Sequence, residues 1–118
     1  MFAFAIWDKK KHELYLARDQ WGIKPLYYYL TDKTFMFASE IKALLPHPDF
    51  KKEFNGDILS SYLCFNSVAT DESFFKGVFK LKPGHYLKYD FDQDKLEINE
   101  YYNINFTFQI CLPPFIKI

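Results

Sequence analysis

The sequence predicts an α+β fold, mainly an antiparallel β-meander with two short helices. Short runs of apolar residues alternate with a period of two, and turn signals separate these runs. Residues 57–65 differ, because their apolar side chains recur at helical spacing. With 49% hydrophobic and 21% aromatic residues among 118, the chain has enough apolar side chains to form a core.

Four strands are expected in the first third of the chain. The first alternates Phe2, Phe4 and Ile6 on one face with Ala3 and Ala5 on the other. Because both faces are apolar, we expect this strand inside the fold, covered on both sides, with the alanine face closely approached. The four expected strands span residues 1–7, 13–19, 25–30 and 34–38, and their short connections indicate a meander.

Two helices and a terminal hairpin complete the expected elements. Ser39 is predicted to cap a short helix over residues 39–45, which ends before Pro46. The second helix is expected over residues 57–65. The hairpin is expected over residues 80–91 and 95–102, with Pro83 and Gly84 forming the turn that precedes it.

The composition changes after Tyr102. The last sixteen residues contain one charge, a Pro-Pro pair and no clear period. We therefore expect a domain over residues 1–102 and an irregular tail over residues 103–118. This tail is either a divergent end of the domain or, the interpretation we favour, a sequence unrelated to it.

Charge and apolar runs exclude several classes of protein. Basic and acidic residues balance at 15 each, which gives no support for a nucleic-acid partner. The apolar start, MFAFAIWD, has no basic region before it, and no run approaches the about 18 residues of a transmembrane helix. A cytoplasmic protein without a membrane partner is expected.

The residue types that most often perform chemistry form no recognisable site. Cys64 has apolar neighbours and no nearby histidine, so a buried small hydrophobic residue is favoured over a nucleophile. His12, His47 and His85 are scattered and form no zinc-binding pair, so no metal site is expected. The acidic run over residues 90–94 lacks the glycine and glutamate of a calcium loop and predicts a hairpin turn.

Arg18, the only arginine, stands out. Neighbours on a strand point to opposite faces, so Arg18 and Asp19 are not expected to pair with each other. The planar guanidinium suits a carboxylate or backbone carbonyls, and Glu40 is one candidate partner. Gly22 is expected to have a positive φ in the following turn, and Pro25 to fix the entry to the next strand. A structural role is favoured over catalysis.

Three segments together resemble a known family. MFAFAIWD, LARDQWGIKPLYYY and FASEIKALL occur in this order and spacing, and the chain resembles the glutaminase domain of glutamine-hydrolysing asparagine synthetases, which are class II glutamine amidotransferases. KPGHYLKYD and EINEYY resemble the segment that closes that domain. The resemblance covers about residues 1–102.

The resemblance implies a part of an αββα sandwich of the N-terminal-nucleophile hydrolase type. Its parent enzyme, meaning the complete synthetase, uses glutamine, aspartate and ATP, with ATP and Mg²⁺ bound in a separate synthetase domain; a homodimer of the parent is also considered. The signature residues assigned to the scaffold are Arg18, Asp19, Gly22, Pro25, Leu26, Ser39 and Glu40.

The chain departs from the family pattern at the catalytic positions. The family has a cysteine after the initiator methionine, whereas this chain has Phe2, and the pair Asn55-Gly56 follows the expected meander instead of preceding it. The SGGxDS loop of the synthetase domain does not occur. We therefore expect the C-terminal half of a glutaminase domain with no catalytic residue. A fragment of another class II amidotransferase and a non-catalytic module that completes a partner's sheet remain the alternatives.

Overall fold

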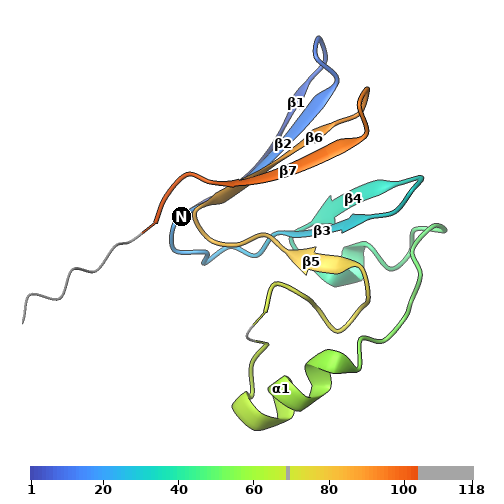
Figure 1. Cartoon of the computed structure of the whole chain (residues 1–118), viewed down its shortest axis with the longest axis vertical. Helices are drawn as coiled ribbons and strands as arrows, with labels where there is room; N and C mark the ends of the chain where they lie inside the picture. The colour runs from blue at the N-terminus through green and yellow to red at the C-terminus, as the bar shows by residue number, and fades with distance from the viewer. Residues whose placement is uncertain (69, 104–118) are drawn as a thin grey trace, which may run out of the picture.

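The computed structural model describes residues 1–68 and 70–103, and these form an α+β fold, as predicted (Figure 1). The expected tail lies outside the described residues except for Asn103. The elements are β1 (Ala3–Asp8), β2 (Glu13–Arg18), β3 (Tyr27–Leu30), β4 (Phe35–Ala38), the 3₁₀ helix η1 (Ile41–Ala43), α1 (Asp57–Phe65), β5 (Val78–Lys80), β6 (His85–Asp90) and β7 (Lys95–Glu100).

The strands form two antiparallel sheets. One has the order β1-β2-β6-β7 and the other the order β4-β3-β5 (Figure 1). The expected single meander is therefore wrong, because β2 and β3 follow each other in the chain but lie in different sheets. Both edges of β2 are occupied by β1 and β6, and both edges of β3 by β4 and β5. The hairpin of β6 and β7 is confirmed.

A hydrophobic core joins the two sheets. Leu14 and Leu16 of β2 and Leu87 of β6 pack with Leu26 and Tyr28 at the start of the second sheet. Leu16 and Leu87 are fully buried. The side chains that face each other across the two sheets therefore supply most of the contacts that hold the sheets together.

A second core covers the other face of the β4-β3-β5 sheet. Tyr29 and Val78 of this sheet pack with Leu44 and Phe50, which follow β4 in the chain. Because successive strand residues point to opposite faces, the neighbouring tyrosines of β3 belong to two different cores. The β4-β3-β5 sheet is thus buried on both faces.

The strand β1 lies at a sheet edge, which corrects the expected interior position. Ala3 is partly buried and packs against the core between the sheets, but Ala5, which pairs with the buried Leu16, is itself exposed, so the close approach expected on the alanine face holds only at Ala3. Phe4 and Ile6 lie on the outer face and are 44% and 55% exposed. Phe4 and Ile6 are side chains that favour burial, which is what the apolar pattern indicated, but among the described residues no segment covers them.

The two expected helices have different outcomes. α1 spans Asp57–Phe65, as predicted. The expected helix over residues 39–45 is reduced to the three residues of η1, and Ser39 is not its cap: Glu40 occupies that position and makes no side-chain capping bond. Pro46 follows too closely for a longer helix. No helix in residues 1–68 and 70–103 is long and apolar enough to cross a membrane.

Candidate functional site

The side chain of Arg18 connects two distant segments through backbone carbonyls. Arg18 ends β2 and is 3% exposed. Its Nε donates to the carbonyl of Lys24 at 2.7 Å, its Nη1 to the carbonyl of Leu81 at 2.6 Å, and its Nη2 to the carbonyl of Gly22. The fork thus ties the β2–β3 connection to the chain just after β5. Carbonyls, one of the two predicted kinds of partner, are its acceptors.

The charged guanidinium of Arg18 is buried and has little access to water. Burial lowers the pKa of its guanidinium, and the negative charge of Asp19 acts in the opposite direction. Arginine stays protonated at neutral pH even so, because its ordinary pKa exceeds 12. The three carbonyl dipoles take over the role of water around the cation.

Asp19 organises the turn through its backbone and one carboxylate oxygen. It is 1% exposed. Its Oδ1 accepts from the amide of Gly22 at 2.8 Å, its carbonyl accepts from the amide of Gly84 at 2.9 Å, and its own amide donates to the carbonyl of Phe2 at 3.0 Å. Its Oδ2 accepts no hydrogen bond from the described residues, and the Met1 nitrogen lies 3.6 Å away.

Two glycines allow the segments around Arg18 to approach closely. Gly22 has a φ of 61°, which confirms the expected positive value. A Cβ at Gly22 would lie 2.5 Å from Cγ of Pro83 and 3.1 Å from Cζ of Arg18, and a Cβ at Gly84 would lie 2.4 Å from the carbonyl oxygen of Tyr102. A side chain at either position would displace its neighbours.

The sequence reasoning missed the distant partners of this centre. Tyr101 Oη donates to the carbonyl of Arg18 at 2.6 Å, so the segment that follows β7 also contacts this centre. No periodicity could indicate these contacts, although EINEYY carried part of the family resemblance. We call the whole cluster the Arg18 junction; its members are Arg18, Asp19, Gly22, Leu81, Gly84 and Tyr101.

The remaining signature residues lie apart from the junction or beside it. Leu26 is 4% exposed and belongs to the core between the sheets, directly after Pro25. Ser39 is exposed. The expected pairing of Glu40 with Arg18 is wrong, because Glu40 forms a surface ion pair with Lys42 at 2.7 Å. Position in the chain brought Glu40 near the end of β4, but β4 lies in the other sheet.

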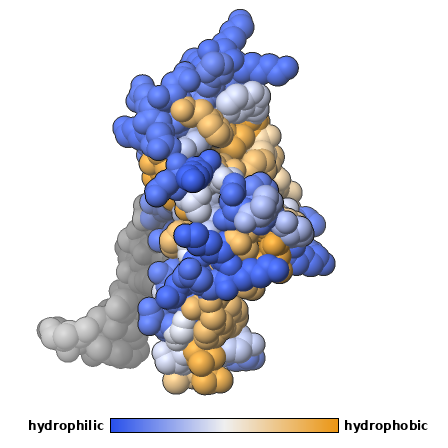
Figure 2. All heavy atoms as spheres, turned by 90° about the vertical axis from the view of Figure 1, so that its right-hand side faces the viewer, coloured by the Kyte–Doolittle hydropathy of each residue, from blue (hydrophilic) through white to orange (hydrophobic). Residues whose placement is uncertain are grey.

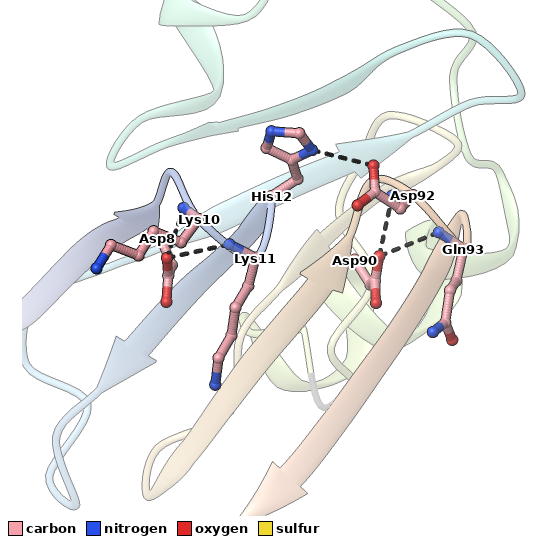
Figure 3. A network of polar contacts seen from close by, with 7 residues as sticks. All are labelled: Asp8, Lys10, Lys11, His12, Asp90, Asp92 and Gln93. Atoms are coloured by element: carbon pink, nitrogen blue, oxygen red, sulfur yellow. Dashed lines mark hydrogen bonds and ion pairs between the residues drawn. The ribbon is translucent and has the colours of Figure 1, made fainter.

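The polar groups at the hairpin tips stabilise turns. Asp8 Oδ1 accepts from the backbone amides two and three residues later at 2.9 and 3.2 Å, and Asp90 Oδ1 does the same at 2.9 and 3.0 Å (Figure 3). His12 Nδ1 lies 3.1 Å from Oδ1 of Asp92 and joins the two tips. The acidic run over residues 90–94 is therefore a hairpin turn, as predicted.

Cys64 is exposed on α1, which corrects the expected burial. Its neighbours Leu63 and Phe65 are apolar, but each is 73% exposed, so apolar sequence context did not mean a core position. In the described part of the chain, no group of three His, Cys, Asp or Glu side chains is placed as a metal ion would require.

The geometry of the Arg18 junction indicates that it positions chain segments relative to one another. The guanidinium of Arg18 and the carboxylate of Asp19 form hydrogen bonds with backbone groups of the β2–β3 connection and of Leu81. The backbone groups of the same two residues bind Phe2 before β1, Gly84 before β6 and Tyr101 after β7. A family model of the glutamine amidotransferase domain matches residues 1–102. The chain belongs to this family.

Curated relatives agree with this membership. This glutamine amidotransferase chain is 40% identical over 105 residues to asparagine synthetase [glutamine-hydrolyzing] 3 of Bacillus subtilis, a match that covers 88% of the chain and 17% of the relative. It is 37% identical over 109 residues to asparagine synthetase [glutamine-hydrolyzing] 2 of the same species, covering 88% of the chain and 15% of the relative. The chain thus spans about a sixth of the length of these relatives.

A relative with another name is less similar. Amidase chry2 of Gibberella zeae is 36% identical over 92 residues, which cover 73% of this amidotransferase chain and 12% of the amidase.

Proposed function

We propose that this chain is a part of the glutaminase domain of a glutamine-hydrolysing asparagine synthetase, which makes L-asparagine from aspartate, ATP and glutamine-derived ammonia. The observation that carries the proposal is the 40% identity to the Bacillus subtilis asparagine synthetase 3 across 88% of the chain. The match to the amidase of Gibberella zeae is shorter and less similar, and therefore favours a part of an amidase less.

In this proposal, the chain forms part of the structural framework of the glutaminase domain. The seven signature residues named above belong to the framework of an αββα sandwich, and the two packed sheets are its two central layers. The shared core of the sheets supports this assignment, as does the Arg18 junction, which fixes the crossing between them. ATP and Mg²⁺ belong to the synthetase portion of the parent enzyme, which we place in the cytoplasm as a homodimer.

The isolated chain is expected to hydrolyse no glutamine. Neither cysteine of the chain, Cys64 or Cys111, follows a methionine as the family's nucleophilic cysteine does, and an enzyme without its nucleophile loses most of its rate enhancement. The measurement is the release of glutamate from glutamine by purified chain, with boiled chain as the control. Heat-labile release above the boiled control would contradict this expectation.

A segment exchange tests the family role directly. In the Bacillus subtilis asparagine synthetase 3, the aligned 105 residues are replaced by the matching segment of this chain, and asparagine formation is measured with glutamine and, separately, with ammonia as the nitrogen source. Activity with both sources supports the proposal. Activity with ammonia alone would show that the segment does not support a glutaminase domain, and would overturn it.

A further inference from the structure

The pair Asn55-Gly56 directly precedes the helix α1. Asn55 is 8% exposed, whereas Gly56 is exposed. The amide nitrogen of Gly56 forms no hydrogen bond with the described residues, and a Cβ at Gly56 would meet nothing within 4 Å. This nitrogen is therefore free to approach the side-chain carbonyl carbon of Asn55, and glycine has no Cβ to hinder that approach.

Few contacts hold Asn55 in its buried position. Its backbone amide donates to the carbonyl of Phe74 at 2.8 Å. Its Nδ2 lies 3.4 Å from Oε2 of Glu72 and is the donor there, because an ionised carboxylate only accepts. Beside these bonds, Phe54 and Phe75 form an isolated β-bridge and not part of a longer ladder. The attachment of this segment is therefore local and short.

The helix that follows adds little to this attachment. Ile58 is the one buried residue of α1, and no side chain caps the N-terminus of the helix. Leu63 and Phe65 are 73% exposed. Figure 2 shows hydrophobic side chains gathered at the lower end of the molecule, where α1 lies in Figure 1. Because segments with few buried apolar contacts open locally, we expect the segment before α1 to open while both sheets stay folded.

A cavity beside Asn55 gives water a route to its side chain. The cavity has a volume of about 220 Å³, and Asn55, Asp57 and Glu72 contribute to its wall. A polar cavity of this size has room for water. Water can therefore reach the side-chain amide, and a small leaving molecule can escape.

We propose that Asn55 is a site of spontaneous deamidation that reacts when the segment before α1 opens. The nitrogen of Gly56 attacks Cγ of Asn55, the bond from Cγ to Nδ2 breaks, and Nδ2 leaves as ammonia with the proton that the Gly56 amide gives up. Water then opens the resulting succinimide ring at either of its carbonyls. The products are aspartate and isoaspartate, and the reaction needs no oxidant or reductant.

The product cannot re-form the closed contact. A carboxylate at residue 55 would lie where Nδ2 of Asn55 donates to Glu72, and two like charges at this distance repel each other. Isoaspartate also adds a methylene group to the main chain between residue 55 and α1. Deamidation therefore makes a transient opening permanent.

Peptide mass spectrometry of the full 118-residue chain, kept at mildly alkaline pH, tests the site. Aspartate and isoaspartate are expected to accumulate at Asn55. Gly56→Ala should slow this conversion at least about tenfold, because its Cβ hinders ring closure while nothing in the fold obstructs it. Asn99, which is exposed but lies within β7, is the internal reference and should convert more slowly than Asn55.

The same measurement in urea tests the dependence on opening. In urea that unfolds the chain, Asn55 should convert at least about tenfold faster than in the folded chain, which exposes it only during openings. Equal rates in the two conditions, or no conversion in the folded chain, would overturn the proposal. So would a Gly56→Ala variant that converts as fast as the unmodified chain, or an equally fast conversion of Asn99.

Hydrogen exchange tests whether the opening becomes permanent. The probe is the amide of Lys76, which donates to the carbonyl of Glu53 at 2.9 Å beside the same bridge. Asn55→Asp, which has the structure of one product, should speed this exchange at least about tenfold. Adding Glu72→Gln should restore slow exchange, because the amide of glutamine donates to the new carboxylate. Equally slow exchange in Asn55→Asp and in the unmodified chain would show that the product closes again, and would overturn this consequence.

Discussion

At the scale of single residues, Arg18 shows how backbone carbonyls can accept all the hydrogen bonds that a buried cation makes within the described residues. Its three hydrogen bonds run to carbonyls at Gly22, Lys24 and Leu81, which lie on two segments far apart in the chain. Each of these carbonyls would otherwise need another partner, and a planar fork reaches all three at once. The side chain therefore fixes the crossing between the two sheets.

Replacing Arg18 with lysine is expected to destabilise the chain by about 2–4 kcal/mol. A single ammonium cannot reach three carbonyls, so at least one acceptor stays unpaired in a buried place. Urea unfolding at low protein concentration measures the change in free energy, and Lys42→Arg, at an exposed position, serves as the control with an expected change below about 0.5 kcal/mol. Equal midpoints for both variants would refute the role of the fork.

Gly22→Ala is expected to destabilise the chain by about 1–3 kcal/mol. The new Cβ would meet Pro83 and Arg18 at a φ of 61°, a conformation that costs non-glycine residues energy. Gly56→Ala is the matched control, because its φ is −68° and nothing lies within 4 Å of its added Cβ. Thermal unfolding of both variants should show a lower Tm for Gly22→Ala alone; a similar loss at both glycines would remove the argument.

Tyr89 makes stability depend on pH in the alkaline range. Its hydroxyl donates to Oδ1 of Asp94, and this bond, then burial, raises the pKa of Tyr89 to about 12. The unfolded phenol loses its proton near pH 10 while the folded one keeps it. The contribution is thus fully present below pH 10 and is lost as the pH rises from 10 to 12. Asp94→Asn should flatten that decline in urea titrations; identical slopes in both proteins would count against it.

At the scale of elements, the sequence predicted what is local. Ile58 and Tyr62 recur at helical spacing, and α1 has the predicted bounds. The three-residue β5 escaped notice, because its identity as a strand depends on pairing with β3. The same limit explains the false meander: alternation indicates that a segment is a strand, but its sheet depends on which edges other strands occupy.

In the candidate site, too, local features could be predicted from the sequence and long-range contacts could not. The positive φ of Gly22 follows from the conformational freedom of glycine, so the residue type predicted it. The shape of the guanidinium left a carboxylate and backbone carbonyls both open as partners of Arg18, and the structure has carbonyls. Leu81 and Tyr101 join the junction across 63 and 83 positions of sequence, and no local pattern encodes such contacts. Glu40 was chosen for its charge and position, but it follows β4, which lies in the other sheet, and it pairs with Lys42.

At the scale of the whole molecule, apolar surface gathers in two places. The outer face of β1 exposes Phe4 and Ile6 beside a strand edge that pairs with no other strand in residues 1–68 and 70–103, and α1 exposes Leu63 and Phe65. Exposed apolar surface of this kind is typical of contact regions, and the chain spans about a sixth of the length of its asparagine synthetase relatives.

The β1 edge leads to the last prediction, that the isolated chain self-associates. An exposed apolar edge strand can pair with a second copy, and lysine on an edge strand opposes such pairing. Light scattering after size-exclusion chromatography should show a mass that rises with concentration, and Ile6→Lys should shift it toward the 14.2 kDa monomer. Gln93→Lys adds the same charge in the β6–β7 turn and should leave association unchanged. A monodisperse monomer that unfolds cooperatively would show that this edge is not adhesive, and an equal response to both lysines would assign the effect to net charge alone.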